Sequence, residues 1–188
     1  NKARQKRFVV NTNKYLKVAN FVSDTARKKI ISEETLLPNG EKRAIGFKSL
    51  PQDNDDFRNA MLDNVLWNGA SVAYSDFRGA SMRSAKCDES NFNHGDFRVA
   101  DIRWSMFNRS LLYNCNFSQA KLFHDHVNDS RLDSSDFRGA NMFGMTGHRA
   151  SLRHCDFTNA LMKDVEFTHA DFSYSKAIHT RFIRAVLT

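Results

Sequence analysis

Apolar side chains recur at every fifth position along the last two-thirds of the chain. From Phe57 to Leu187 the run covers 27 positions without a change of register, and only Gly147 and Ala177 lack a sizeable apolar side chain. A period of five matches neither the 3.6-residue period of an α-helix nor the two-residue period of a β-strand. The pattern therefore predicts a repeat architecture.

A second period of 20 residues lies over the first. It is carried by the segments DFRNA (56–60), DFRGA (76–80), DFRVA (96–100), NFSQA (116–120), DFRGA (136–140) and DFTNA (156–160). Four five-residue units would then form one coil, and equivalent units would stack from coil to coil. The phenylalanines of these segments are expected to form one continuous internal column.

A second inward position is expected two residues before each apolar centre. It holds mostly Ala, Ser, Cys, Val or Gly, as at Ala60, Val65 and Cys115. Alternating large and small inward side chains would fill a narrow interior to native density. The other three residues of each unit are mostly Asp, Asn, Arg, Ser and Thr, and we expect them to face water.

These units resemble the pentapeptide-repeat proteins, whose consensus is Ala-(Asp/Asn)-(Leu/Phe)-X-X. The match is close at Ala80-Ser81-Met82, Ala100-Asp101-Ile102, Ala140-Asn141-Met142 and Ala170-Asp171-Phe172. The resemblance covers roughly residues 55–188 and implies an all-β solenoid, a right-handed four-sided β-helix of six to seven coils. At a ladder spacing of about 4.8 Å, the rod would be roughly 30 Å long.

The basic character of the chain belongs to residues 1–54, which carry 12 Lys/Arg against 5 Asp/Glu, whereas residues 55–188 carry 16 of each. An apolar stripe from Phe8 to Ala26 predicts a helix, and Pro38-Asn39-Gly40 predicts a hairpin turn. Residues 1–54 would then form a small helical and hairpin cap over the first coil. Alternatively, residues 1–29 would act as a basic arm for an acidic partner, nucleic acid or an anionic membrane.

No signal-peptide pattern or membrane-length apolar run stands out, so we expect a cytoplasmic protein, either of the producing cell or of a host cell. Because the chain starts with Asn1, we expect a fragment of a larger protein or a processed product.

Candidate chemistry is sparse in the sequence. Cys87, Cys115 and Cys155 fall on inward positions, which predicts buried reduced thiols. In the stretch His124-Asp125-His126 the two histidines flank an inward position, so they would point away from a shared metal. For Asp125 itself, we expect a hydrogen bond to the backbone. With no catalytic constellation, we predict a protein that is not an enzyme and has no metal site or cofactor.

A cluster of apolar and cationic residues on outward positions is the main candidate site. The residues assigned to it are Trp104, Phe123, Phe143, Arg103, Tyr113 and His124. Exposed aromatic residues beside arginine are typical of recognition surfaces. Two alternatives remain open here: a protein partner covers this patch, or the N-terminal segment folds back over it.

A second apolar patch is expected at the C-terminal end, where Ile178, Ile183 and Val186 occupy outward positions. An open coil exposes unpaired ladder groups, which proteins normally cover. A homodimer contact, a further domain or lattice neighbours would close it. The resemblance favours a homodimer, since quinolone-resistance members of the family pair through their C-terminal coils.

Two functions follow from these patterns. The first is a non-enzymatic protein–protein interaction scaffold, either a bacterial effector or an interaction domain of a larger protein. The alternative, implied by the resemblance, is a DNA-mimicking protein that protects the topoisomerase gyrase and is related to quinolone resistance. A DNA mimic needs a strongly acidic surface, however, and residues 55–188 have no net charge and carry outward arginines such as Arg83 and Arg98.

Overall fold

The computed structural model describes residues 34–36, 42–44, 51 and 53–188. Two short strands, β1 (Glu34–Leu36) and β2 (Lys42–Ala44), pair antiparallel with Glu34 opposite Ala44. They lie on either side of the predicted turn at Pro38-Asn39-Gly40. The predicted helix between Phe8 and Ala26 lies outside the described residues.

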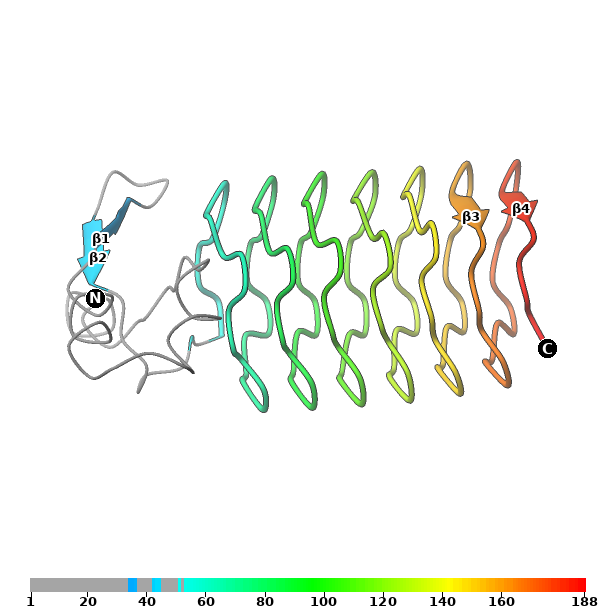
Figure 1. Ribbon diagram of the computed structural model, residues 1–188, viewed down its shortest axis with the longest axis horizontal. Coiled ribbons are helices and arrows are strands. Elements are labelled where there is room, and N and C mark those ends of the chain that lie inside the picture. The colour runs from blue at the N-terminus through cyan, green and yellow to red at the C-terminus, as the bar shows by residue number, and fades with distance from the viewer. Residues whose placement is uncertain (1–33, 37–41, 45–50, 52) are drawn as a thin grey trace.

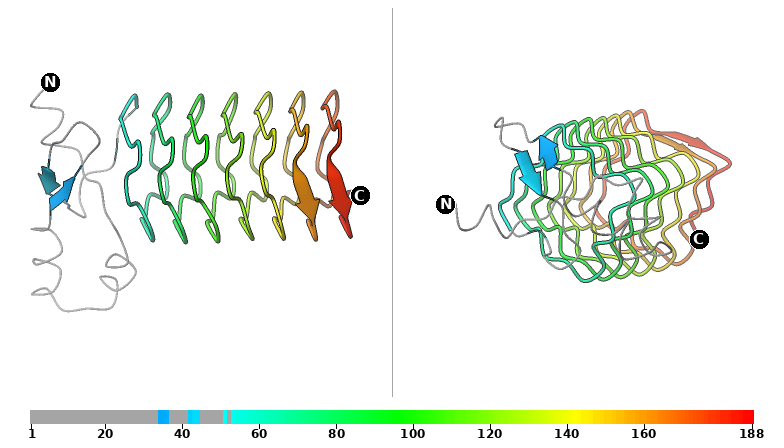
Figure 2. Two further views of the ribbon diagram at one scale, coloured as in Figure 1. Left: turned by 90° about the horizontal axis from the view of Figure 1, so that it is seen from above. Right: turned by 60° about the vertical axis from the view of Figure 1, so that its left-hand side comes forward.

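From residue 53 onward the chain winds into a rod of stacked coils (Figure 1). Every fifth residue forms a parallel bridge with the residue 20 positions further on, as Asp56 does with Asp76 and Met61 with Ser81. Near the C-terminal end the bridges lengthen into β3 (Leu161–Lys163) and β4 (Arg181–Ile183), which pair parallel with Leu161 opposite Arg181. The coils follow one another in register along the rod axis (Figure 2).

Each five-residue unit contains one tight turn and forms one wall of a four-sided coil. In the first unit, Ala60 N–H donates to Phe57 O over 3.0 Å and closes the turn. The residue before it, Asn59, has a φ of 54°. Phe57 N–H and Asn59 N–H then donate forward to the next coil, to Asp76 O and Arg78 O, over 2.8 and 2.9 Å. The backbone is thus satisfied between coils rather than within a broad sheet.

The predicted phenylalanine column is present in the interior. Its members stack face to face, with ring centroids 4.6 Å apart between Phe77 and Phe97 and 4.9 Å apart between Phe97 and Phe117. The irregular unit at Met145 and Gly147 is also accommodated. Met145 is buried at the small position, and the ring of Phe167 occupies the space where a Cβ of Gly147 would lie.

Inward hydroxyl groups join neighbouring coils through the core. The Ser110 hydroxyl donates to Cys87 O over 2.8 Å and accepts the Ser90 N–H over 3.1 Å. The same backward bond, from residue n to the carbonyl of residue n−23, is formed by Ser90, Ser105, Ser130, Ser135, Ser175 and Thr180. These inward polar side chains therefore link coils where an alanine could not.

Asp125 occupies one of these inward positions and is fully buried. Its Oδ1 accepts the Ser105 N–H over 2.7 Å, as expected, whereas Oδ2 has no hydrogen-bond partner within the described residues. Burial, and secondarily the charge of Asp101, raise the pKa of Asp125 well above its ordinary value. Burial therefore favours the neutral carboxylic acid form of this side chain.

The Asp and Arg columns beside the phenylalanine stack are engaged with each other. Arg78 is paired with Asp76 of its own unit over 2.6 Å and lies 3.7 Å from Asp96 of the next coil. The hydrogen bond from Arg58 holds the pKa of Asp56 below its ordinary value. This wall is a ladder of mutually neutralising charges.

The described part of the chain contains no helix that could cross a membrane.

Candidate protein interface

One wall of the rod carries most of the residues assigned to the main candidate site. It is formed by the units centred on Leu62, Met82, Ile102, Leu122, Met142, Met162 and Phe182, and we call it the aromatic wall. The residues after each centre lie in the turn and point outward. Trp104 and His124 occupy the turn position with φ values of 62° and 57°, and their N–H groups donate to Phe123 O and Phe143 O.

Arg103 lies between two aromatic rings on this wall. Its guanidinium carbon is 5.1 Å from the ring centroid of Trp104 and 5.7 Å from that of Phe123. Asp101 anchors the guanidinium through an ion pair of 2.7 Å, and this hydrogen bond raises the pKa of Arg103. Half of the Trp104 surface remains exposed (50%). Arg103 therefore holds a half-exposed indole in place.

The stack continues along the rod axis through Phe123 and Phe143. Their rings meet edge to face, with centroids 6.5 Å apart and an interplanar angle of 89°. His124 packs its ring edge-on against Phe143 at 4.9 Å, and Lys163 places Nζ 5.3 Å from the centroid of the same ring. Both phenylalanines are partly buried.

Two residues of this cluster were absent from the sequence-based assignment. Lys163 follows Phe143 by 20 residues in the same column, and Gly144 follows His124 in the next. A Cβ at Gly144 would collide with the imidazole of His124, so glycine makes room for that ring. The 20-residue spacing was the available signal, but composition alone does not mark a lysine or a glycine as part of an aromatic cluster.

Tyr113 does not belong to the cluster, which corrects the sequence-based assignment. It lies ten residues from both Arg103 and Phe123, which is half a coil, and therefore on the opposite wall. Its hydroxyl accepts a hydrogen bond from Arg131 over 2.8 Å. The assignment failed because two units along the chain correspond to two corners of a four-sided coil.

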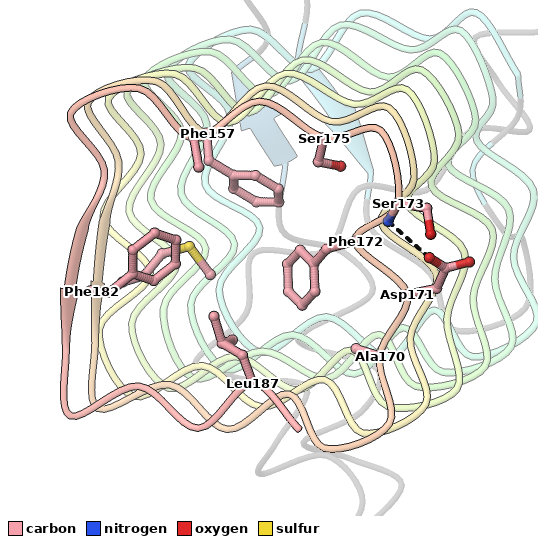
Figure 3. A pocket seen from close by; sticks show the side chains of 10 residues that line it. Phe157, Ala170, Asp171, Phe172, Ser173, Ser175, Phe182 and Leu187 are labelled. Atoms are coloured by element: carbon pink, nitrogen blue, oxygen red, sulfur yellow. Dashed lines mark hydrogen bonds between the residues drawn. The ribbon is translucent and has the colours of Figure 1, made fainter.

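The C-terminal end of the rod is a second apolar surface. The predicted end residues Ile178, Ile183 and Val186 are exposed. Inward side chains of the last coil add to them, since Phe182 and Leu187 are 46% and 42% exposed. These two residues line a hollow of about 470 Å³ together with Phe157, Met162 and Phe172 (Figure 3).

The cysteine side chains, which could in principle react, have structural roles. Cys87, Cys115 and Cys155 are buried free thiols, as predicted. Cys115 donates to Phe92 O over 3.1 Å and Cys155 to Leu132 O over 3.2 Å, so both replace serine in the inward bonds. Burial raises the pKa of both thiols to about 12.

The three residues of the His124-Asp125-His126 stretch diverge. His124 packs on Phe143, Asp125 lies in the core, and His126 Nδ1 is 2.7 Å from Thr146 Oγ1. Within the described residues, no group of three or more His, Cys, Asp or Glu side chains could hold a metal ion.

The rod is built from similar five-residue units, and one of its walls displays a cluster of aromatic side chains. These features are typical of a repeat protein. The family model for pentapeptide repeats, which spans eight copies, matches residues 150–188. Residues 150–188 are therefore pentapeptide repeats. Comparison with curated proteins finds no match.

Solved structures of the same kind resemble the rod. QnrB1, a plasmid-mediated fluoroquinolone resistance protein, is 20% identical, with 64% of this chain and 70% of that chain covered and a TM-score of 0.50. Rfr23, from the cyanobacterium Cyanothece 51142, is 12% identical, with 66% and 89% covered and a TM-score of 0.34. HetL, from Nostoc sp. strain PCC 7120, is 15% identical, with 68% and 74% covered and a TM-score of 0.21. The fold is a right-handed β-helix.

Proposed function

We propose that the rod is a non-enzymatic scaffold that binds another protein through the aromatic wall. The observation that carries the proposal is the contiguous stack of Arg103, Trp104, Phe123, Phe143 and Lys163 on one wall. Aromatic and arginine side chains dominate the energetics of protein interfaces. A rigid rod also holds these side chains in place before binding, which lowers the entropic cost of association.

The absence of catalytic function is part of this proposal. The groups whose pKa is strongly raised, Asp125 and the three thiols, lie in the core, where a substrate has no access. The carboxylates with lowered pKa, such as Asp63 and Asp129, are bound by arginine on the outside of the rod. Both sets of shifts are consistent with structural roles.

Residues 1–54 are assigned to the first end of the rod in this proposal. A polar cap over the first coil would cover its open ladder, as terminal repeats of solenoids require. The alternative is a basic arm for an anionic partner, since the segment carries a net charge of +7. At the other end, Ile178, Ile183 and Val186 are proposed as a homodimer contact.

A second candidate function comes from the similarity to QnrB1. It is the protection of gyrase by a protein that imitates DNA, and it is supported by a fold-level resemblance at 20% identity. Arg58, Arg78, Arg98 and Arg138 lie among the carboxylates of the ladder wall, which reduces any resemblance to rows of phosphate. Unchanged gyrase supercoiling at micromolar protein would exclude this function.

The test of the scaffold is affinity capture from a lysate of the parent or host cell. We expect the wild-type chain to retain a partner that the Trp104→Ala/Phe123→Ala variant loses. The matched control is Leu111→Ala/Tyr113→Ala, because both side chains lie on the opposite wall. Circular dichroism would establish that both variants fold. Capture of the same proteins by all three forms would rule out the aromatic wall as the interface.

A further inference from the structure

We infer that the aromatic wall binds an acidic, extended peptide segment of the partner, with carboxylates at both ends and an apolar side chain between them. This inference rests on the proposed function and adds the chemistry of the partner. It is carried by the distribution of charge over the four walls and by the order of side chains along one column.

Charge is distributed unequally over the walls. The ladder wall that contains Asp56 and Arg58 carries five cations and five carboxylates, and the wall opposite the aromatic wall carries two cations and three carboxylates, Asp53 included. The fourth wall carries three cations and four carboxylates. On outward positions, the aromatic wall carries six cations against three carboxylates, an excess of three cations: Arg83, Arg103, Lys121, Lys163, Arg181 and Arg184 against Asp63, Asp101 and Asp164.

Half of the cations of this wall form no ion pair with another residue that the structure describes. Arg83, Arg103 and Arg184 are each paired with a carboxylate of the same wall. Across residues 53–188, no ion pair involves Lys121, Lys163 or Arg181. An incoming carboxylate would therefore gain a partner at Lys121 or Lys163 without displacing an ion pair, and at Arg83 it would share the guanidinium with Asp63.

The order of side chains sets the pattern of the ligand. One column runs Arg83, Arg103, Phe123, Phe143 and Lys163, so cations lie at both ends of an aromatic centre. Four coil steps separate Arg83 from Lys163, which is about 19 Å at a ladder spacing of about 4.8 Å. An extended peptide rises about 3.3 Å per residue, so about six residues would span this distance.

The geometry of the rings favours a peptide over a nucleic acid. Non-specific binding of single strands relies on open aromatic faces on which bases stack. Here, Arg103 lies over both Trp104 and Phe123, and Lys163 lies over Phe143, while the two phenylalanine rings meet edge to face. The rings therefore do not form the row of parallel faces on which successive bases would stack.

Charge also argues against the N-terminal segment as the occupant. Residues 1–54 have a net charge of +7, and the aromatic wall is itself positive. Like charges brought together at a surface oppose association. The segment that binds the wall therefore belongs to another molecule.

The first test is selection from a display library of random peptides about twelve residues long, twice the predicted span. The target is the 188-residue chain, with counter-selection on the Trp104→Ala/Phe123→Ala variant. We expect enriched peptides with Asp or Glu on both sides of an aromatic or aliphatic residue. Peptides that depend on the aromatic pair but carry no acidic excess would overturn this inference and leave the interface standing. Failure to enrich any such peptide would overturn both proposals.

The second test measures the affinity of the best peptide by fluorescence anisotropy. Reversing two unpaired charges in Lys121→Glu/Lys163→Glu should weaken binding roughly tenfold or more, since it replaces attraction by repulsion. The opposite-wall variant Arg131→Glu/Arg153→Glu makes the same change in net charge and should bind as wild type. Equal losses in both variants would mean that net charge, rather than this site, attracts the peptide.

A single-stranded oligothymidylate of matched length serves as the nucleic-acid probe at near-physiological salt. We expect it to bind more weakly than the peptide. If it binds more tightly, and the Lys121→Glu/Lys163→Glu variant loses that binding, the occupant is a nucleic acid and the peptide assignment is wrong.

Discussion

Inward polar side chains explain how a carboxylate is tolerated in the core of this rod. At equivalent positions, serine accepts an N–H from one coil and donates to a carbonyl three residues earlier in that coil, as Ser105 does with Ala85 N and Met82 O. Asp125 already accepts the Ser105 N–H. A protonated Oδ2 would complete the pattern by donating to Ile102 O, the carbonyl 23 residues before it.

This account predicts a pH-dependent difference between the wild-type chain and Asp125→Asn. Because the folded pKa of Asp125 lies above its unfolded value, its contribution to stability is greatest below about pH 4 and is lost as pH rises through the folded pKa. Asparagine can accept from Ser105 N and donate to Ile102 O at every pH. We expect it to be more stable than wild type by about 1–3 kcal/mol at neutral pH, with a smaller difference near pH 4.

The measurement is the urea midpoint of both proteins across this pH range. Subtracting the two curves removes the titration of the shared surface carboxylates. A difference that does not change with pH would contradict a raised pKa for Asp125.

At the scale of the element, the repeating unit depends on one unusual backbone conformation. The second residue after each apolar centre has a positive φ in every unit from residue 54 to residue 184. Glycine, which adopts this conformation without strain, occupies the position only at residues 69, 79, 139 and 144. Most of the non-glycine residues there are Asn, His, Ser, Asp or Arg. Val99 differs from these residues because its side chain is β-branched. It has a φ of 61° and is 58% exposed.

We expect Val99→Gly to stabilise the rod by about 1 kcal/mol, because a β-branched residue is strained at positive φ and the exposed side chain contributes little packing. Gly79 and Gly139 occupy the same column and adopt φ values of 66°. The reverse change, Gly139→Val, should destabilise by a similar amount. Thermal unfolding of both variants tests the pair, and an unchanged midpoint in both would remove the strain argument.

At the scale of the whole molecule, each coil is stabilised by the coils on either side of it. In the middle of the rod, Phe97 stacks on both Phe77 and Phe117. In the last coil, Phe182 and Leu187 occupy inward columns yet remain almost half exposed. The free energy of local opening should therefore be highest in the centre and lowest at the C-terminal end.

Hydrogen exchange monitored by mass spectrometry tests this gradient in the 188-residue chain. At low protein concentration, we expect amides of residues 172–188 to exchange fastest among residues 53–188. If Ile178, Ile183 and Val186 form the proposed homodimer, raising the concentration should protect these amides and leave the central coils unchanged. Exchange that is independent of concentration would contradict the dimer, and uniform protection along the rod would contradict the gradient.

The sequence by itself determined the fold, the register and the core of residues 57–167. This was possible because each unit of a solenoid repeats the same local geometry, so a period of five translates directly into a wall and a period of 20 into a coil. The burial of Phe57, Cys115 and Asp125 could therefore be predicted from position alone. The column of Arg103, Phe123 and Phe143 followed from the same rule.

Only the tertiary structure decided which outward side chains touch and how the inward polar groups are satisfied. Lys163 belongs to the stack because it contacts Phe143. Tyr113 does not, because it lies two corners of the coil away, on the opposite wall. The bond from Ser110 to Cys87 O spans 23 residues, which no local pattern reveals. These features depend on the distances between stacked corners, whereas periodicity specifies only which column a residue occupies.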